Sequence, residues 1–216
     1  MSKLMFSAIG VGGISVASVG GYMIIKRKAE STAKTFRNAY SLAILEDKDS
    51  LWNSKFEALK SDSQTTPSHP KLIEAKAKFA VQTSNENAKQ LQKEGCGEIY
   101  DSKLEGTTYL QDFQKYCSKT IKNGISDNWI TQPKTDSSKW DPKLTALKTH
   151  NISQYGELDT ALKNLKSQLL ASTGNDLDEN KRGILKEWCD GVQGEIFMGD
   201  KDAKFMHAKL YCTGSQ

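Results

Sequence analysis

Cysteines are the residues of this chain whose spacing points most directly to chemistry, and that chemistry is disulfide formation. Cys96 and Cys117 lie 21 residues apart, and Cys189 and Cys212 lie 23 residues apart. By chain-entropy arguments, a disulfide closing a loop of about 22 residues stabilises a small domain by about 3 kcal/mol. Four cysteines allow three pairings, and buried free thiols or a metal site are the alternatives. No C-x-x-C or H-x-x-x-H spacing is present, which disfavours zinc ligation.

Histidines are the next residues that could carry chemistry, and the chain has three. His69 falls in a proline-rich stretch and His150 in a polar stretch, so both are expected in solvated loops. His207 lies between Met206 and Ala208 on the last predicted helix, a position typical of packing rather than of ligation. None of the three is therefore predicted to be catalytic.

Acidic residues gather just before the last predicted helix, around Gly199. They are Glu195, Asp200 and Asp202. Carboxylates at the start of a helix complement its dipole, so we prefer a capping role over a calcium site. The chain contains no G-x-S-x-G, H-E-x-x-H, P-loop or EF-hand spacing. We therefore predict no catalytic residue, no cofactor and no bound metal, and a protein that is not an enzyme.

An internal duplication positions the cysteines. Three landmarks recur in the same order: WNSKFEALK at 52–60 and WDPKLTALK at 140–148, K-E-x-C at 93–96 and 186–189, and Y-C at 116–117 and 211–212. Their separations are 88, 93 and 95 residues, and the first pair shares five of nine residues. Two cysteines at matching positions of each copy favour pairing within each copy, Cys96 with Cys117 and Cys189 with Cys212.

Helical periodicity follows the duplication. Residues at i, i+4 and i+7 form one apolar stripe in each copy: Trp52, Phe56 and Leu59, then Trp140, Leu144 and Leu147. A second stripe is clear in the second copy, at Tyr155, Leu158, Leu162, Leu165 and Leu169, and weaker in the first, at Leu72, Ile73, Ala77, Phe79 and Ala80. No stretch alternates as a strand would, so the predicted fold is all-α.

The predicted organisation is a membrane helix followed by two duplicated small helical bundles, each with one disulfide. The expected segments are an anchor with a basic flank at 1–28, a juxtamembrane helix at 29–45, repeat unit 1 at 46–120, a linker at 121–137 and repeat unit 2 at 138–216. A bundle of about 75 residues buries little apolar area, so a disulfide in each would add needed stability.

The amino-terminal segment is apolar enough to be a membrane anchor. Leu4 to Ile25 runs for 22 residues without a charge, about 33 Å as a helix, against a hydrocarbon core of about 30 Å. Gly13, Ala17 and Gly21 fall on one face, which permits close helix approach within a bilayer. Residues 4–25 are therefore predicted to contact lipid. A cleaved signal peptide and a buried soluble helix are the alternatives.

The net charge of +4 is confined to this end of the chain. Lys3, Lys26, Arg27 and Lys28 carry it, and residues 29–216 contain equal numbers of basic and acidic side chains. A nucleic-acid-binding surface is therefore not indicated. The basic residues after the apolar segment favour a cytoplasmic carboxyl-terminal part, whereas paired cysteines favour an oxidising exterior. We prefer the external orientation, with an inward-facing scaffold carrying reduced cysteines as the alternative.

The glycine-rich apolar start, the W-x-x-K-x-x-A-L-K motif, the KEWC at 186–189 and the final YC together resemble uncharacterised paralogous families of haemotropic mycoplasmas. The resemblance extends over nearly the whole chain, but its motifs are structural and supply no catalytic residue. It implies a membrane-associated or surface-exposed protein in a wall-less bacterium.

Trp129 is the tryptophan of the expected linker and has no counterpart in the other copy. Since tryptophan is enriched at binding hot spots, we single it out for contact outside its own bundle. The sequence thus predicts a single-pass cell-membrane protein with its carboxyl-terminal region outside. We expect contact with a host surface protein or an antigenic role, without catalysis.

Overall fold

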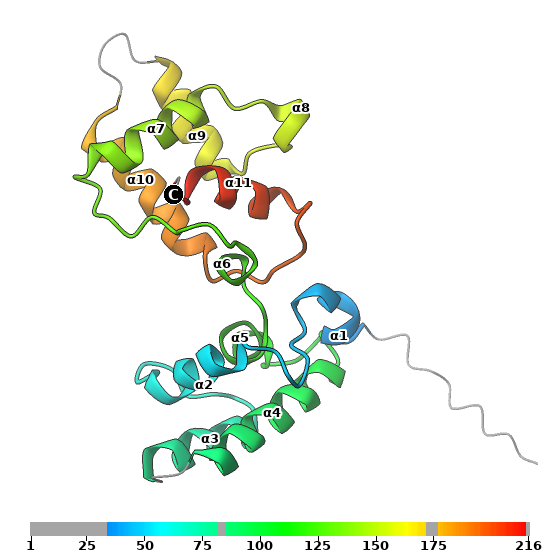
Figure 1. Ribbon diagram of the computed structural model, residues 1–216. Helices are drawn as coiled ribbons and strands as arrows, with labels where there is room; N and C mark the ends of the chain where they lie inside the picture. Colours follow the sequence, from blue (N-terminus) through cyan, green and yellow to red (C-terminus); the bar gives the residue numbers. More distant parts are fainter. Residues whose placement is uncertain (1–33, 82–84, 172–176, 215–216) are drawn as a thin grey trace, which may run out of the picture. The chain divides into compact units, whose positions relative to one another are not determined.

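Helices make up all the regular secondary structure in the computed structural model, which describes residues 34–81, 85–171 and 177–214. Along the chain they are α1 (Phe36–Ala39), α2 (Trp52–Ser61), α3 (Pro70–Val81), α4 (Glu86–Asp101), α5 (Leu110–Asp112), α6 (Ile121–Gly124), α7 (Ser137–Lys148), α8 (Ile152–Tyr155), α9 (Thr160–Ala171), α10 (Glu179–Val192) and α11 (Ala203–Tyr211), as Figure 1 shows. Extended backbone within these ranges makes only isolated bridges. The predicted all-α class is confirmed.

The two predicted disulfides are both present. Cys96 bonds Cys117 and Cys189 bonds Cys212, with Cα atoms 5.3 and 5.5 Å apart. All four cysteines are fully buried. Each bridge joins a long helix of a repeat to the end of its last helical segment, α4 to the π-helical turn Phe113–Cys117 and α10 to α11. The duplication therefore fixed the connectivity correctly.

The apolar stripes of the two copies form the core. The buried residues of the first stripe are Trp52, Phe56 and Leu59 in α2, and Trp140, Leu144 and Leu147 in α7. Those of the second are Leu72, Ala75 and Phe79 in α3, and Leu162, Leu165 and Leu169 in α9. Ile73, Ala77 and Ala80 are predicted in the stripe of α3 but are all exposed, Ile73 to 44%, whereas Ala75, which the pattern missed, is buried. The i, i+3, i+7 spacing of Leu72, Ala75 and Phe79 places the three exposed residues off the buried face.

A lysine contact repeats in the two copies, made by the buried Lys55 and the half-buried Lys143. Nζ of Lys55 in α2 donates to the backbone oxygen of Lys115 at 3.5 Å, and Nζ of Lys143 in α7 donates to that of Leu210 at 3.2 Å. Each acceptor directly precedes the Tyr-Cys pair of its repeat. Burial lowers the pKa of Lys55 to about 8 and also lowers the pKa of Lys143. The same polar contact thus ties the first helix of each copy to the last.

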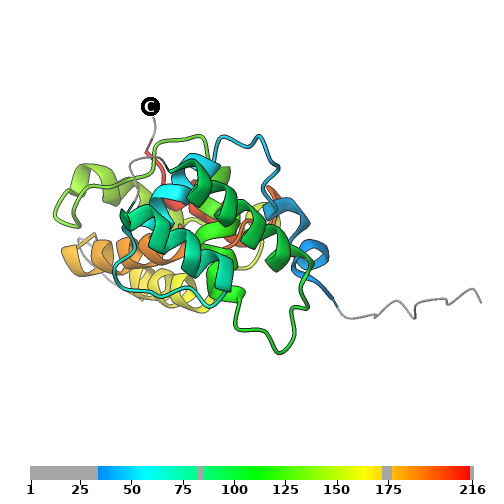
Figure 2. The same cartoon turned by 90° about the horizontal axis from the view of Figure 1, so that it is seen from below.

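Helix α4 packs on α3, and α10 on α9, beside a compensating pair of residues. In the first copy a Cβ on Gly95 would lie 3.2 Å from Nδ1 of His69, so the histidine ring occupies the space beside the glycine. In the second copy the matching residues are Trp188 and Asp159, and the indole Nε1 donates to Oδ2 of Asp159 at 2.6 Å. The absence of a side chain at Gly95 lets α3 and α4 lie close together, side by side in Figures 1 and 2.

The segment expected as a juxtamembrane helix over 29–45 is not one helix in its described part. Residues 34–45 form α1 and a 3-10 turn, Ser41–Ala43. Backbone bridges fix this segment to the first repeat at Thr35 with Lys103 and at Ile44 with Ser118. Phe36 is buried with its ring 5.0 Å from that of Phe113. These tertiary contacts outweigh the helical periodicity of a short segment.

The segment expected as a linker, residues 121–137, packs against the second repeat. Backbone N–H groups of Ile121 and Ile130 donate to Glu195 and Cys212 at 2.8 Å each. Both isoleucines are buried. Ala33–Gln216 accordingly forms one compact unit, and the boundaries between the repeats remain a prediction.

The predicted anchor, with Leu4, Gly13, Ala17, Gly21 and Ile25, lies outside the described residues. Within the described part of the chain, no helix has the length and apolar character needed to cross a bilayer.

Candidate contact surface

Trp129 is held beside the carboxyl-terminal disulfide. It forms an isolated bridge with Thr213, and the backbone oxygen of Asn128 accepts from the N–H of Gly214 at 2.8 Å. The side chain is partly exposed and packs on the core. Nζ of Lys122 lies 5.9 Å from the ring centroid, and the indole nitrogen has no hydrogen-bond partner among the described residues. Trp129 is therefore a partly exposed residue packed on the core, not a free side chain of a linker.

A groove with a volume of about 410 Å³ lies in the same repeat. Its lining residues are Asp127, Lys143, Tyr155, Met206, Lys209 and Leu210. Nζ of Lys209 lies 3.9 Å from Oδ2 of Asp127. Apolar side chains flanked by two lysines and one carboxylate can bury an apolar group of a partner and also pair with charges at its edge.

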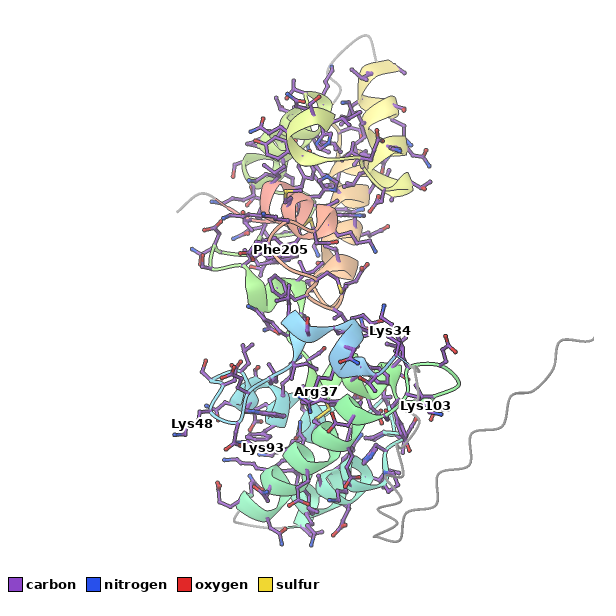
Figure 3. The ribbon with its side chains drawn as sticks, turned by 90° about the vertical axis from the view of Figure 1, so that its right-hand side faces the viewer. Lys34, Arg37, Lys48, Lys93, Lys103 and Phe205 are labelled. Atoms are coloured by element: carbon purple, nitrogen blue, oxygen red, sulfur yellow. A yellow bond between two sulfur atoms is a disulfide. The ribbon has the colours of Figure 1, made fainter. Side chains whose placement is uncertain are left out.

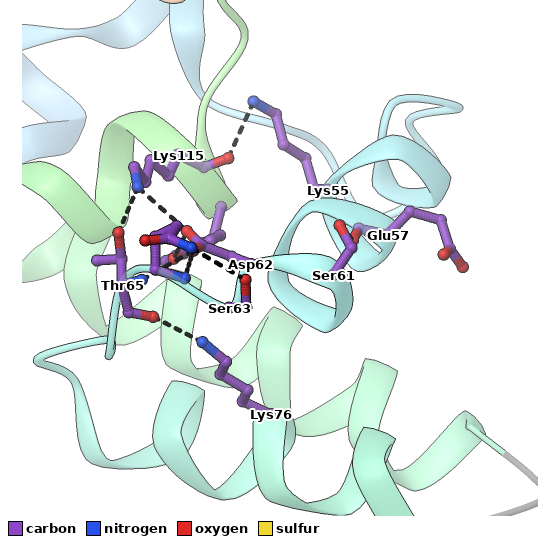
Figure 4. A network of polar contacts seen from close by, with 10 residues as sticks. Lys55, Glu57, Ser61, Asp62, Ser63, Thr65, Lys76 and Lys115 are labelled. Carbon is purple, nitrogen blue, oxygen red and sulfur yellow. Dashed lines mark hydrogen bonds and ion pairs between the residues drawn. The ribbon is translucent and has the colours of Figure 1, made fainter.

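The first repeat has polar side chains at the matching positions. Leu210 corresponds to Lys115, whose Nζ lies 3.1 Å from Oδ2 of Asp62 and 2.6 Å from Oγ1 of Thr65. Figure 4 shows this network, which also includes Lys76 donating to the backbone oxygen of Thr65 at 2.6 Å. These residues satisfy one another instead of lining an apolar groove. The two copies therefore differ in surface chemistry although they share a core.

Asp62 is the centre of that network. Tyr116 donates its hydroxyl to Oδ2 at 2.7 Å, and the backbone N–H groups of Gln64 and Thr65 donate to Oδ1 at 2.9 and 2.8 Å. These bonds, led by that from Tyr116, and the Lys115 ammonium hold the pKa of Asp62 well below its usual range. A carboxylate that is ionised and saturated in this way has a structural role and is not placed to act as a general base.

A second apolar area lies on α8 and α9. Ile152 is 51% exposed and Leu170 is 58% exposed, and both line a groove of about 320 Å³. The matching residues in the first repeat are Gln64 and Ala80. The second repeat therefore carries two apolar grooves whose counterparts in the first repeat have more polar or smaller side chains.

The first repeat instead carries a charged groove of about 360 Å³. Lys93, labelled in Figure 3, forms an ion pair with Asp47 at 2.9 Å, and its Nζ lies 5.6 Å from the ring centroid of Trp52. Trp52 itself is only 5% exposed. Since the aromatic ring is covered and most of the lining residues are polar or charged, this groove offers a partner less apolar area than those of the second repeat.

Two of the three histidine predictions were wrong. His69 and His150 were expected in solvent, but only 5% and 7% of them are exposed. His207 was expected at a packing position and is 1% exposed, which confirms that prediction. Alignment of the two copies could have predicted this burial. His150 and His207 align with Asp62 and Asp112 of the first copy, and polar residues at matching positions indicate a shared polar interior.

The acidic residues before α11 divide into a cap and an ion pair. The side chain of Asp202 accepts from the backbone N–H of Phe205 at 3.1 Å, as expected of a helix cap. Glu195 pairs with Lys204 at 2.6 Å. The described residues contain no group of three or more metal-binding side chains.

No protein-family model matches the chain, and neither a curated protein nor a solved structure similar to it was found. Arguments about function therefore rest on the disulfides, the grooves and the amino-terminal sequence of this chain itself.

Proposed function

We propose that the chain is a membrane-anchored surface protein that binds partner molecules of a host cell, or varies as an antigen, without catalysing a reaction. The observation that supports this most is the pair of buried disulfides at matching positions of the two repeats. Structural disulfides form and persist in oxidising surroundings and are rare in a reducing cytoplasm. A protein built around two of them has its carboxyl-terminal part outside the cell.

The anchor in this proposal is residues 4–25, which hold the chain at the bilayer. The resemblance to uncharacterised paralogous families of haemotropic mycoplasmas implies a membrane-associated or surface-exposed protein, which supports this placement. The second repeat provides the contact surface, because Trp129 and the two apolar grooves all belong to it or lie beside it. A partner with apolar side chains and a few charges at its edge, such as a folded host surface protein, suits these grooves.

Protease treatment of intact cells tests the placement. Cells expressing the full chain with a carboxyl-terminal epitope are treated with a protease that does not enter them, and the epitope is detected afterwards. We expect loss of the epitope from intact cells, whereas a cytoplasmic marker protein survives. Survival of the epitope until the cells are lysed would overturn the external placement.

The alternative function is an inward-facing scaffold on the same membrane anchor. It requires reduced cysteines, because the cytoplasm keeps thiols reduced. Thiol titration of the protein, unfolded directly from cells in the presence of an alkylating reagent, separates the two functions. The surface protein has no titratable thiol, whereas the scaffold has four.

A further inference from the structure

Two histidines in the second repeat lie together in its interior. The rings of His150 and His207 are 5.2 Å apart between centroids and nearly perpendicular. In the duplicated sequence they take the positions of Asp62 and Asp112. The first repeat therefore has carboxylates where the second has imidazoles, so different groups take up protons in the two repeats.

Hydrogen bonds define the protonation of this histidine pair. Nε2 of His150 lies 2.9 Å from the backbone oxygen of Gly156, which can only accept, so Nε2 carries the hydrogen. Nδ1 of the neutral ring is then an acceptor and takes the hydroxyl hydrogen of Tyr211 at 2.6 Å. Nε2 of His207 likewise donates to the backbone oxygen of Tyr155 at 2.9 Å. The two rings thus hold the adjacent residues Tyr155 and Gly156 at the carboxyl end of α8.

Protonation keeps the hydrogen bonds of both Nε2 atoms, and the Tyr211 hydroxyl can turn to accept from a protonated Nδ1 of His150. The cost of protonation lies instead in placing charge inside the repeat, where both rings are at most 7% exposed. A charge on both rings would place two imidazolium groups 5.2 Å apart in a buried site, where like charges repel strongly. Burial lowers the pKa of His207, and the neighbouring His150 lowers it further.

Charged groups also face the pair from the surrounding elements. Carboxylates act on it from the segments before α9 and α11, and lysines approach from α7 and α9: they are Glu157, Asp159, Asp202, Lys143 and Lys166. Nζ of Lys166 donates to the backbone oxygen of His150 at 3.0 Å. The hydrogen bond to the backbone oxygen of Tyr155 raises the pKa of His207, as do the carboxylates of Asp159 and Asp202, but burial is the larger effect and lowers it.

The remaining histidine, in the first repeat, differs in its partner. Nε2 of His69 lies 3.3 Å from Oε2 of Glu98, a carboxylate that can pair with a protonated ring. His150 and His207 have backbone oxygens and a tyrosine at that distance instead. Burial lowers the pKa of His69 as it lowers that of His207, whereas the Glu98 carboxylate raises the pKa of His69.

We propose that His150 and His207 form an acid-sensitive latch that releases the α8 turn, residues 151–159, when the surroundings of the protein become mildly acidic. Release would loosen Ile152, which lines the apolar groove on α8 and α9, and so would change the contact surface of the second repeat. This inference concerns regulation and goes beyond the proposed function.

The sign of the effect follows from proton linkage. The pKa of His207 is lowered in the folded chain, so below a pH of about 6.5 the released state binds more protons than the closed state. The closed turn is therefore most stable above that pH and is lost progressively as the pH falls. Each unit by which the pKa is lowered favours release by at most about tenfold.

Amide hydrogen exchange of the full chain in detergent, followed by mass spectrometry, tests the latch. Exchange is measured at pH 7.5 and 5.5 and corrected for the intrinsic rates. We expect peptides covering 151–159 to lose protection at the lower pH, by up to about tenfold for one titrating imidazole. His207→Gln keeps an N–H donor for Tyr155 but does not titrate, so it should remove at least half of this loss. His69→Gln, the matched control, should leave the loss unchanged.

The proposal would be overturned if His207→Gln lost as much protection at pH 5.5 as the wild-type chain does. Equal protection of 151–159 at both pH values in the wild-type chain would also overturn it. Titration of the three imidazoles by nuclear magnetic resonance does not depend on a variant folding. We expect His207 to titrate below a pH of about 6.5, the unperturbed value. Titration at or above that value would also overturn the proposal.

Discussion

The ring of Phe197 lies against Gly124, so close that a Cβ on this glycine would be 2.8 Å from ring carbons Cδ2 and Cε2. Phe205, labelled in Figure 3, would be 2.9 Å away. Gly124 ends α6 in the segment between the repeats, whereas both aromatic residues belong to the second repeat. The segment therefore docks through a residue without a side chain.

Gly124→Ala should destabilise the protein by about 1–3 kcal/mol, because the methyl group overlaps two buried rings. The matched control is Gly97→Ala in α4, where an added Cβ meets no atom within 4 Å. That change should stabilise by about 0.5–1 kcal/mol, since alanine favours a helix interior. Urea denaturation measures both free energies of unfolding. Equal effects of the two changes would contradict the close packing at Gly124.

Loss of either disulfide should cost about 3 kcal/mol of unfolding free energy, because the two loops have nearly equal lengths. The variants are Cys96→Ser with Cys117→Ser, and Cys189→Ser with Cys212→Ser. We expect each to lower the Tm by roughly 6–12 °C, measured by circular dichroism without reductant. If the Tm of each double variant matched that of the wild-type chain, the disulfides would not support the fold as described.

Lys55 should make the free energy of unfolding depend on pH in the alkaline range. Burial lowers its pKa to about 8 in the folded chain, whereas an unfolded lysine titrates near 10.4. Between these values the unfolded state binds more protons, so stability rises with pH, by up to about 3 kcal/mol. Lys55→Met should remove this rise between about pH 8 and 10, measured by urea denaturation. Lys60→Met, an exposed position on the same helix, should keep it.

The matching tyrosines should respond to acid in different pH ranges. Tyr116 lowers the pKa of Asp62, so the stability it contributes is full above the unfolded pKa of about 3.9 and falls as Asp62 is protonated. The cost of Tyr116→Phe should therefore be smaller at about pH 3 than at about pH 6. Tyr211→Phe, whose partner is His150, should show no decrease in cost between about pH 4 and 3. Identical pH profiles for the two variants would contradict the contacts seen.

The duplication made much of this fold predictable. Matching landmarks aligned Trp52 with Trp140 and fixed which cysteines pair, because residues at matching positions of two copies occupy matching places. The all-α class followed from apolar spacing, since one face of each helix must be buried. Ile73 was misassigned because two apolar residues in succession leave the exact face of a short helix undefined.

The polar interior was harder to predict. His150 has the composition of a solvated loop around it, and only tertiary structure places Tyr211 and Gly156 within reach of its ring. The grooves depend on side chains from segments far apart in the sequence, such as Asp127 and Lys209. Periodicity within one helix carries no information on such contacts. The bonds of residues 34–45 to the first repeat are likewise tertiary and overrode a helical pattern.

The most direct measurement of the central claim is mass-spectrometric mapping of disulfides in protein taken from cells in the presence of an alkylating reagent. A surface protein with two separately locked repeats yields one linked peptide pair that joins Cys96 to Cys117 and another that joins Cys189 to Cys212. Four alkylated cysteines, or links that cross between the repeats, would contradict the claim that each repeat of a surface protein is closed by its own disulfide.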